Sequence, residues 1–195
     1  FIILGGPFAS GSGNVMMILG DTLLESVPLI MTGLSVAIAF KTGLFNIGAP
    51  GQYLMGAMTA LIIALSMDTT TCPAFFVWVL AFLAGTAVGA LWGAIPGLFK
   101  AFLNVNEVIV CIMTNWIAAN IVSWVFRENQ QFVNVAETKM NFVKPTSKNG
   151  VMTWRMGLDK IFEGSNIDCS IFLVILIAIG IYILINKTTL GYELK

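Results

Sequence analysis

The sequence contains no histidine, and only 10% of its 195 residues are charged. Without histidine, the chain lacks the commonest metal ligand and the usual general base at neutral pH. Ten basic and ten acidic residues give a formal net charge of zero, and no basic cluster is present, so nucleic acid is not an expected partner. We therefore expect no catalytic residues, no metal site and no cofactor in this chain.

Apolar residues take the place of the missing charge. Hydrophobic residues make up 57% of the chain, and the mean hydropathy is +0.89. A soluble domain of this composition would expose far too much apolar surface, whereas membrane lipid accommodates it. The sequence therefore predicts an all-α integral membrane protein. Because the chain begins with Phe1 and stops at Lys195 after a polar turn, we interpret it as a fragment of a larger protein.

Five apolar runs predict a bundle of about five transmembrane helices, since about 20 residues cross the hydrocarbon core. Asp21 or Thr22 is expected to cap the first span, with residues 5–20 forming a loop before it. Residues 127–168 hold six basic and five acidic residues and predict one long hydrophilic loop. The predicted spans are residues 23–40, 53–67, 74–99, 108–126 and 169–186.

A segment rich in glycine and proline breaks the pattern between the first two spans. From Gly43 to Gly51, three glycines and Pro50 weaken the helical hydrogen-bond ladder. Irregular backbone at membrane depth is tolerated only where it is buried in protein or lines a wet cavity. Asn46 and Gln52 supply the polar side chains there. The alternative is an ordinary interhelical loop in which these amides act as caps.

Small residues recur at every fourth position on two neighbouring spans. Such a stripe lets another helix backbone approach closely, because helix association in lipid depends on close van der Waals contact. We therefore predict that these residues pack helix against helix. On the second span the stripe follows Gln52 with Gly56, Ala60 and Ala64, and on the third span it consists of Ala81, Gly85, Gly89, Gly93 and Gly97.

The fourth span carries a polar stripe that includes Glu107, Cys111 and Asn115, since steps of four residues return to nearly the same helix face. Ionisable residues inside a membrane are candidates for function. For Glu107, an interfacial carboxylate at a helix N-terminus is an equal alternative. For Asn115, the alternative is an interhelical hydrogen bond that serves packing alone.

The three cysteines follow no metal-binding spacing. Cys111 lies inside a span, whereas Cys72 and Cys169 border loops on what could be one side of the membrane. A disulfide between those two remains open, and unpaired thiols acting as small apolar side chains are favoured.

Four motifs in order carry a family resemblance: residues 27–34 (VPLIMTGL), 43–57 (GLFNIGAPGQYLMGA), 106–110 (NEVIV) and 188–192 (TTLGY). With them the chain, from about residue 21 to its end, resembles the permeases of bacterial ABC importers. The nearest group is the nucleoside and simple-sugar permeases, which are related to the ribose and branched-chain amino-acid permeases. The resemblance implies a multi-pass protein of the bacterial inner (plasma) membrane that moves a small solute.

The resemblance also implies partners: cytoplasmic ABC ATPase subunits, a second permease subunit and an extracytoplasmic solute-binding protein. No phosphate-binding loop of the form G-x-x-x-x-G-K-[ST] is present, so ATP hydrolysis is expected on a separate subunit. Coupling to the ATPase is expected at Thr188, Leu190 and Gly191. The residues that we expect along the solute path are Asn46, Gly48, Gly51, Gln52, Glu107 and Asn115.

The resemblance places the chain's end in the cytoplasm, which puts loop 127–168 outside the cell. Four lysines of short segments then obey the positive-inside rule, namely Lys41, Lys100, Lys187 and Lys195, whereas the six basic residues of the long loop oppose it.

Three other classes of function compete with the importer. An ion-coupled secondary transporter also uses broken helices, but Glu107 is the one carboxylate that we expect to be embedded in the membrane. A membrane-embedded enzyme lacks the histidines and clustered carboxylates that it would need. A pore or a purely structural bundle would fit the glycine stripe alone.

Overall fold

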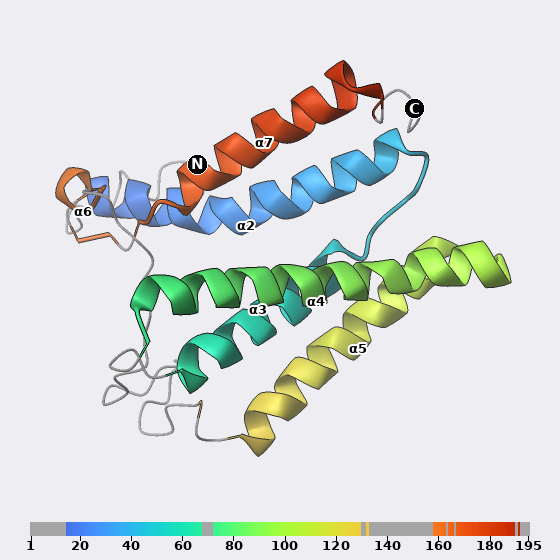
Figure 1. Ribbon diagram of the computed structural model, residues 1–195, viewed down its shortest axis with the longest axis horizontal. Coiled ribbons are helices and arrows are strands. Elements are labelled where there is room, and N and C mark those ends of the chain that lie inside the picture. Colours follow the sequence, from blue (N-terminus) through green and yellow to red (C-terminus); the bar gives the residue numbers. More distant parts are fainter. Residues whose placement is uncertain are drawn as a thin grey trace. The chain divides into compact units, whose positions relative to one another are not determined.

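The computed structural model describes residues 15–67, 72–129, 132, 158–162, 164–165, 167–189 and 191. These residues form helices and connections, with no strand among them. Five of the helices are long and apolar enough to cross a membrane, which confirms the predicted all-α membrane class. They are α2 (Val15–Lys41), α3 (Ala49–Ser66), α4 (Ala74–Leu103), α5 (Glu107–Glu128) and α7 (Ser170–Lys187), and a short α6 spans Leu158–Ile161 (Figure 1).

The chain divides into two compact units, which we describe separately. One unit comprises residues 1–42 and 153–195 and contains α2, α6 and α7, and the other comprises residues 43–152 and contains α3, α4 and α5. In the first unit α2 packs along α7 (Figure 1). In the second, α4 packs extensively against α3, and both contact α5.

The start of the first span was predicted wrongly. Helix α2 begins at Val15, so residues 15–20 are helical instead of forming a loop. The apolar run from Val15 to Leu19 continues the helix toward its N-terminus. Neither predicted capping residue caps it: the Thr22 hydroxyl donates to the carbonyl of Ile18 at 2.7 Å, one turn earlier in the same helix. The remaining residues of the predicted loop, 5–14, lie outside the described residues.

The residues just before α7 pack onto the beginning of α2. Ser165 is 3% exposed, and its hydroxyl donates to Asp21 Oδ1 at 2.9 Å and accepts from the backbone N–H of Ile167 at 3.1 Å. Gly20 provides the space for this contact, because a Cβ there would clash with the side chain of Ser165. Asp168 then accepts from the backbone N–H of Ser170 at 3.0 Å, where α7 begins.

Helices α3 and α4 meet through their small residues. A Cβ added to Gly56 would lie 2.9 Å from the carbonyl oxygen of Gly85, and one added to Gly85 would lie 2.9 Å from that of Gly56. A Cβ on Gly89 would lie 3.3 Å from the backbone oxygen of Gln52. Real Cβ atoms essentially never show the 2.9 Å distances found at Gly56 and Gly85, so larger side chains there would force these two helices apart.

The ends of this stripe differ from its middle. Ala81, at one end, is buried. At the other end, a Cβ added to Gly97 would meet no described atom within 4 Å, so the structure does not support a packing role for Gly97. Helix α4 continues past this position to Leu103 and ends at Asn104, which has the left-handed φ of 50° that often terminates helices.

Candidate functional site

The non-helical backbone before α3 is shorter than predicted. It covers residues 44–48, preceded by a turn at Thr42 and Gly43 with a φ of 73° at Gly43. Helix α3 then begins at Ala49 with Pro50 in its first turn, where a missing N–H costs nothing. Gly51 and Gln52 are therefore helical, whereas Asn46 and Gly48 belong to the irregular stretch.

Asn115 of α5 holds both sides of this helix start. Its Oδ1 accepts from the backbone N–H of Gly51 at 2.9 Å, and its Nδ2 donates to the carbonyl of Ile47 at 2.9 Å. The N-cap of α3 is Gly48, which makes no side-chain cap. A helix start normally receives such a bond from its own N-cap side chain. Here a neighbouring helix supplies it instead.

Asn46 and Cys111 complete the contacts of the irregular stretch. Asn46 Oδ1 accepts from the backbone N–H of Gly48 at 2.8 Å, a local turn of the kind that asparagine favours. The thiol of Cys111, which is 1% exposed, also lies 3.6 Å from this oxygen. A Cβ on Gly48 would lie 2.9 Å from Asn46 Oδ1 and 3.2 Å from the Cys111 sulfur, so the stretch passes close to α5.

Gly51 and Gln52 face two other side chains of the unit. A Cβ on Gly51 would lie 2.6 Å from Asn115 Oδ1 and 3.3 Å from Trp92 Nε1. The side chain of Gln52 lies against Gly93 of α4, whose added Cβ would be 3.0 Å from the Gln52 amide. Three helices thus bring neutral polar groups together at the start of α3. We name this junction, formed by Asn46, Gly48, Gly51, Gln52 and Asn115, the amide junction.

Trp92, which borders the amide junction, is a residue that sequence reasoning missed. Its position gave one usable signal, since it precedes Gly93 and follows Gly89 by three residues on the face of α4 that meets α3. The sequence alone offered no reason to separate it from the four other tryptophans.

Glu107 lies at the first turn of α5, where it forms an ion pair with Lys100 of α4 at 2.8 Å. The two side chains are 21% and 38% exposed. The backbone of Phe45, in the irregular stretch, lies close to this carboxylate. This geometry matches the alternative of a carboxylate at a helix N-terminus. Asn106, the N-cap, accepts from the backbone N–H of Val108 at 2.9 Å.

Thr188 belongs to the predicted ATPase-coupling site, directly after α7. Its hydroxyl donates to the carbonyl of Leu184 at 2.5 Å and accepts from the backbone N–H of Gly191 at 3.3 Å. Its extended backbone (φ −115°, ψ 158°) is followed by helical backbone at Thr189 and Gly191. Thr188 therefore ends one helix and caps the next. The third predicted coupling residue, Leu190, lies outside the described residues.

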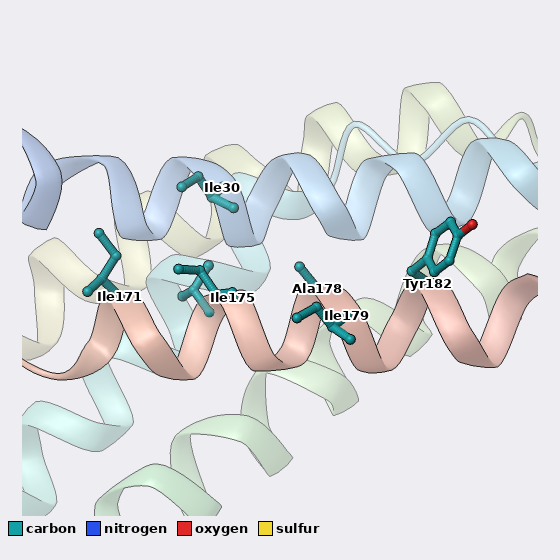
Figure 2. Close-up of a pocket in the computed structure, with 7 residues that line it drawn as sticks. Ile30, Ile171, Ile175, Ala178, Ile179 and Tyr182 are labelled. Carbon is teal, nitrogen blue, oxygen red and sulfur yellow. The ribbon is translucent and has the colours of Figure 1, made fainter.

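Two pockets lie between α2 and α7. One, of about 160 Å³, is lined by Lys41, Thr42 and Gly191 together with aliphatic side chains. The other, of about 340 Å³, is lined by Tyr182 of α7 and by aliphatic side chains, which include Ile30 of α2 (Figure 2). Neither pocket is lined by a side-chain amide of the kind found at the amide junction.

The thiols and carboxylates that the structure describes do not form a metal site. No three of them gather closely enough to hold a metal ion within the described ranges. Cys72, Cys111 and Cys169 are all free thiols.

Comparison with known proteins identifies the family of the chain. Residues 18–195 match the family described as the branched-chain amino acid transport system permease component. The chain is 36% identical to the guanosine ABC transporter permease protein NupP of Bacillus subtilis over 90% of its length, and that match covers 48% of NupP. It is 33% identical to the nucleoside ABC transporter permease protein NupB of Lactococcus lactis over 96% of its length, covering 50% of NupB.

A third relative is the glucose ABC transporter permease protein TsgB13 of Haloferax volcanii, at 31% identity over 90% of the chain and 46% of the relative. No solved structure matches the chain. The chain thus spans about half the length of these relatives. With five apolar helices in the part of the chain that the structure describes, it is a multi-pass protein of the inner membrane, and it belongs to the branched-chain amino acid transport system permease component family.

Proposed function

We propose that this chain is part of the transmembrane subunit of an ABC importer that carries nucleosides. Two of the three relatives described above are named as permeases for guanosine or nucleosides, and the third as a permease for glucose. All three names describe neutral, hydroxyl-bearing solutes or a class of them. The structural observation that carries the proposal is the amide junction, where Asn115 bonds to backbone on both sides of the start of α3.

The junction has the chemistry that a path for such a solute requires. Its amides are neutral, and each both donates and accepts hydrogen bonds. Sugar hydroxyls have the same dual character, so amides can exchange backbone partners for solute without stranding a charge in the membrane. Hydrogen bonds between neutral groups are individually weak, at about 0.5–1.5 kcal/mol net. A path of this kind passes solute on instead of trapping it.

Coupling to ATP is proposed to occur at the helix that starts after Thr188. Permease components are not themselves catalytic, so the energy must enter through contact with cytoplasmic ATPase subunits. The double role of the Thr188 hydroxyl supports this placement, because a movement of the following helix would be transmitted directly to the end of α7. A second permease subunit and an extracytoplasmic binding protein complete the proposed assembly.

The test is uptake of radiolabelled guanosine by the full-length protein, expressed with its partner subunits in cells that lack other nucleoside transporters. We expect uptake that vanadate abolishes and that an ionophore leaves intact. Uptake that collapses with the ionophore and resists vanadate would favour the ion-coupled secondary transporter instead. Uptake of glucose but not of guanosine would support the proposed importer and show that its solute is a sugar instead of a nucleoside.

A further inference from the structure

The indole N–H of Trp92 is a polar group for which the fold provides no partner. The Nε1 atom is buried, and within the described residues it has no hydrogen-bond acceptor. Tryptophan N–H groups that are buried usually find an acceptor, and each exception in a folded protein calls for an explanation.

The unpaired donor lies at the amide junction. The position that a Cβ of Gly51 would occupy is 3.3 Å from Trp92 Nε1 and 2.6 Å from Asn115 Oδ1. The next residue along α4, Gly93, contacts the side chain of Gln52. The indole N–H therefore sits where α3, α4 and α5 meet, beside the backbone that Asn115 holds.

Asn115 and the side-chain oxygen of Asn46 are already engaged in hydrogen bonds. Asn115 uses its oxygen for the N–H of Gly51 and its nitrogen for the carbonyl of Ile47. Asn46 Oδ1 is occupied by the N–H of Gly48 and the Cys111 thiol. If the junction opened, its amide side chains could both donate and accept hydrogen bonds with a solute. The indole N–H of Trp92 could only donate one.

We propose that Trp92 is a specificity-determining residue of the solute path, and that its indole N–H bonds an acceptor of a nucleobase when the start of α3 moves away. This rests on the proposed nucleoside importer. A donor that cannot accept is best matched by an acceptor that cannot donate, such as a carbonyl oxygen or an unprotonated ring nitrogen of a purine. Because Nε1 is buried in this conformation, the bond forms only after the junction opens.

The experiment compares Trp92→Phe with Trp116→Phe in the full-length permease, purified with its partner subunits. Both changes keep an aromatic ring and remove one N–H, and Trp116 of α5 is 69% exposed. Thermal unfolding is measured over a titration with guanosine, and guanosine uptake is measured in proteoliposomes. The thermal readout separates a role in solute binding from a role in folding.

For Trp92→Phe we expect the guanosine concentration that half-saturates the stabilisation to rise about 3- to 10-fold, as for loss of one neutral hydrogen bond. The melting temperature without guanosine should stay the same or rise, because an unpaired buried donor has been removed. Uptake at guanosine concentrations below saturation should fall. Trp116→Phe should match the wild type in all three measurements.

An unchanged guanosine titration in Trp92→Phe would overturn the inference while the importer proposal stands, as would a lower melting temperature with an unchanged titration. A wild-type complex that neither binds nor imports nucleosides would overturn the proposed function and this inference with it. If the phenylalanine variant fails to assemble, the benzothienyl analogue of tryptophan replaces the N–H by sulfur at nearly constant shape and is held to the same outcomes.

Discussion

Asn115 of α5 and Gly51 of α3 are joined by a 2.9 Å hydrogen bond from the Gly51 backbone to the Asn115 side chain. The first N–H groups of a helix have no partner within it. Gly48, the N-cap, cannot supply one because it has no side chain. Asn115 therefore caps the N-terminus of α3, as the serine or aspartate at the N-cap position does in other helices. Because Asn115 belongs to α5, the position of α3 depends on α5.

Replacing Asn115 with leucine should consequently impair both stability and guanosine uptake. The change strands the N–H of Gly51 and the carbonyl of Ile47, each at a cost of about 1–3 kcal/mol. The matched control is Asn120→Leu on the same helix, because the Asn120 amide donates to the Trp116 carbonyl one turn earlier in its own helix and is exposed. Uptake per assembled transporter and the thermal midpoint are the measurements. Equal uptake in the two variants would remove Asn115 from the solute path.

Gly51→Ala tests how closely Gly51 of α3 must approach the side chain of Asn115. An added Cβ would lie 2.6 Å from Asn115 Oδ1, closer than real Cβ contacts, so the amide must move and its bond to the helix start is lost. We expect destabilisation of about 1–3 kcal/mol and reduced uptake. Gly33→Ala in α2 is the control, since a Cβ there meets no described atom within 4 Å. That variant should be neutral or slightly more stable, as alanine favours helix.

The small-residue contact of α3 with α4 makes a prediction with an internal control. Gly85→Val would push side-chain carbon into the carbonyl of Gly56 and separate the helices, whereas Gly97→Val on the same helix meets open space. We expect Gly85→Val to lower the yield of assembled, monodisperse protein in size-exclusion chromatography severalfold. Gly97→Val should behave like the wild type. If both valine variants lose yield equally, the cause is valine's helix propensity and not packing.

Neutralising Glu107 tests whether its carboxylate only pairs with Lys100 or also takes part in transport. Its ion pair with Lys100 is partly exposed, and exposed pairs contribute little to stability. Glu107→Gln should therefore leave the thermal midpoint nearly unchanged and preserve most guanosine uptake, with Lys100→Met as the partner variant. Complete loss of uptake in Glu107→Gln, with normal assembly and uptake retained in Lys100→Met, would instead indicate that the carboxylate carries ions or contacts the solute.

Hydropathy was sufficient to predict the five membrane helices, because in lipid the apolar length of a segment and the need to satisfy its backbone leave little choice. The capping rule failed at the start of α2, where the apolar run from Val15 extends the helix past Asp21 and Thr22, which were predicted to cap it. Periodicity placed Glu107 and Asn115 on one face of α5, but it could not say that one pairs with Lys100 and the other reaches α3. Trp92 and the open side of Gly97 depend on where neighbouring helices begin and end, which no local pattern encodes.

Thr188→Val tests coupling at the other end of the chain. Valine keeps the shape of threonine and removes the hydroxyl that joins the carbonyl of Leu184 to the N–H of Gly191. Loss of such a cap costs about 1 kcal/mol of local helix stability. Thr189→Val, at the neighbouring exposed threonine, is the control. If the helix after Thr188 transmits ATP hydrolysis, Thr188→Val should lower the guanosine transported per ATP hydrolysed while guanosine binding stays unchanged. An unaltered ratio would place the coupling contact elsewhere, because weakening this cap would then have no effect on the step that it is proposed to serve.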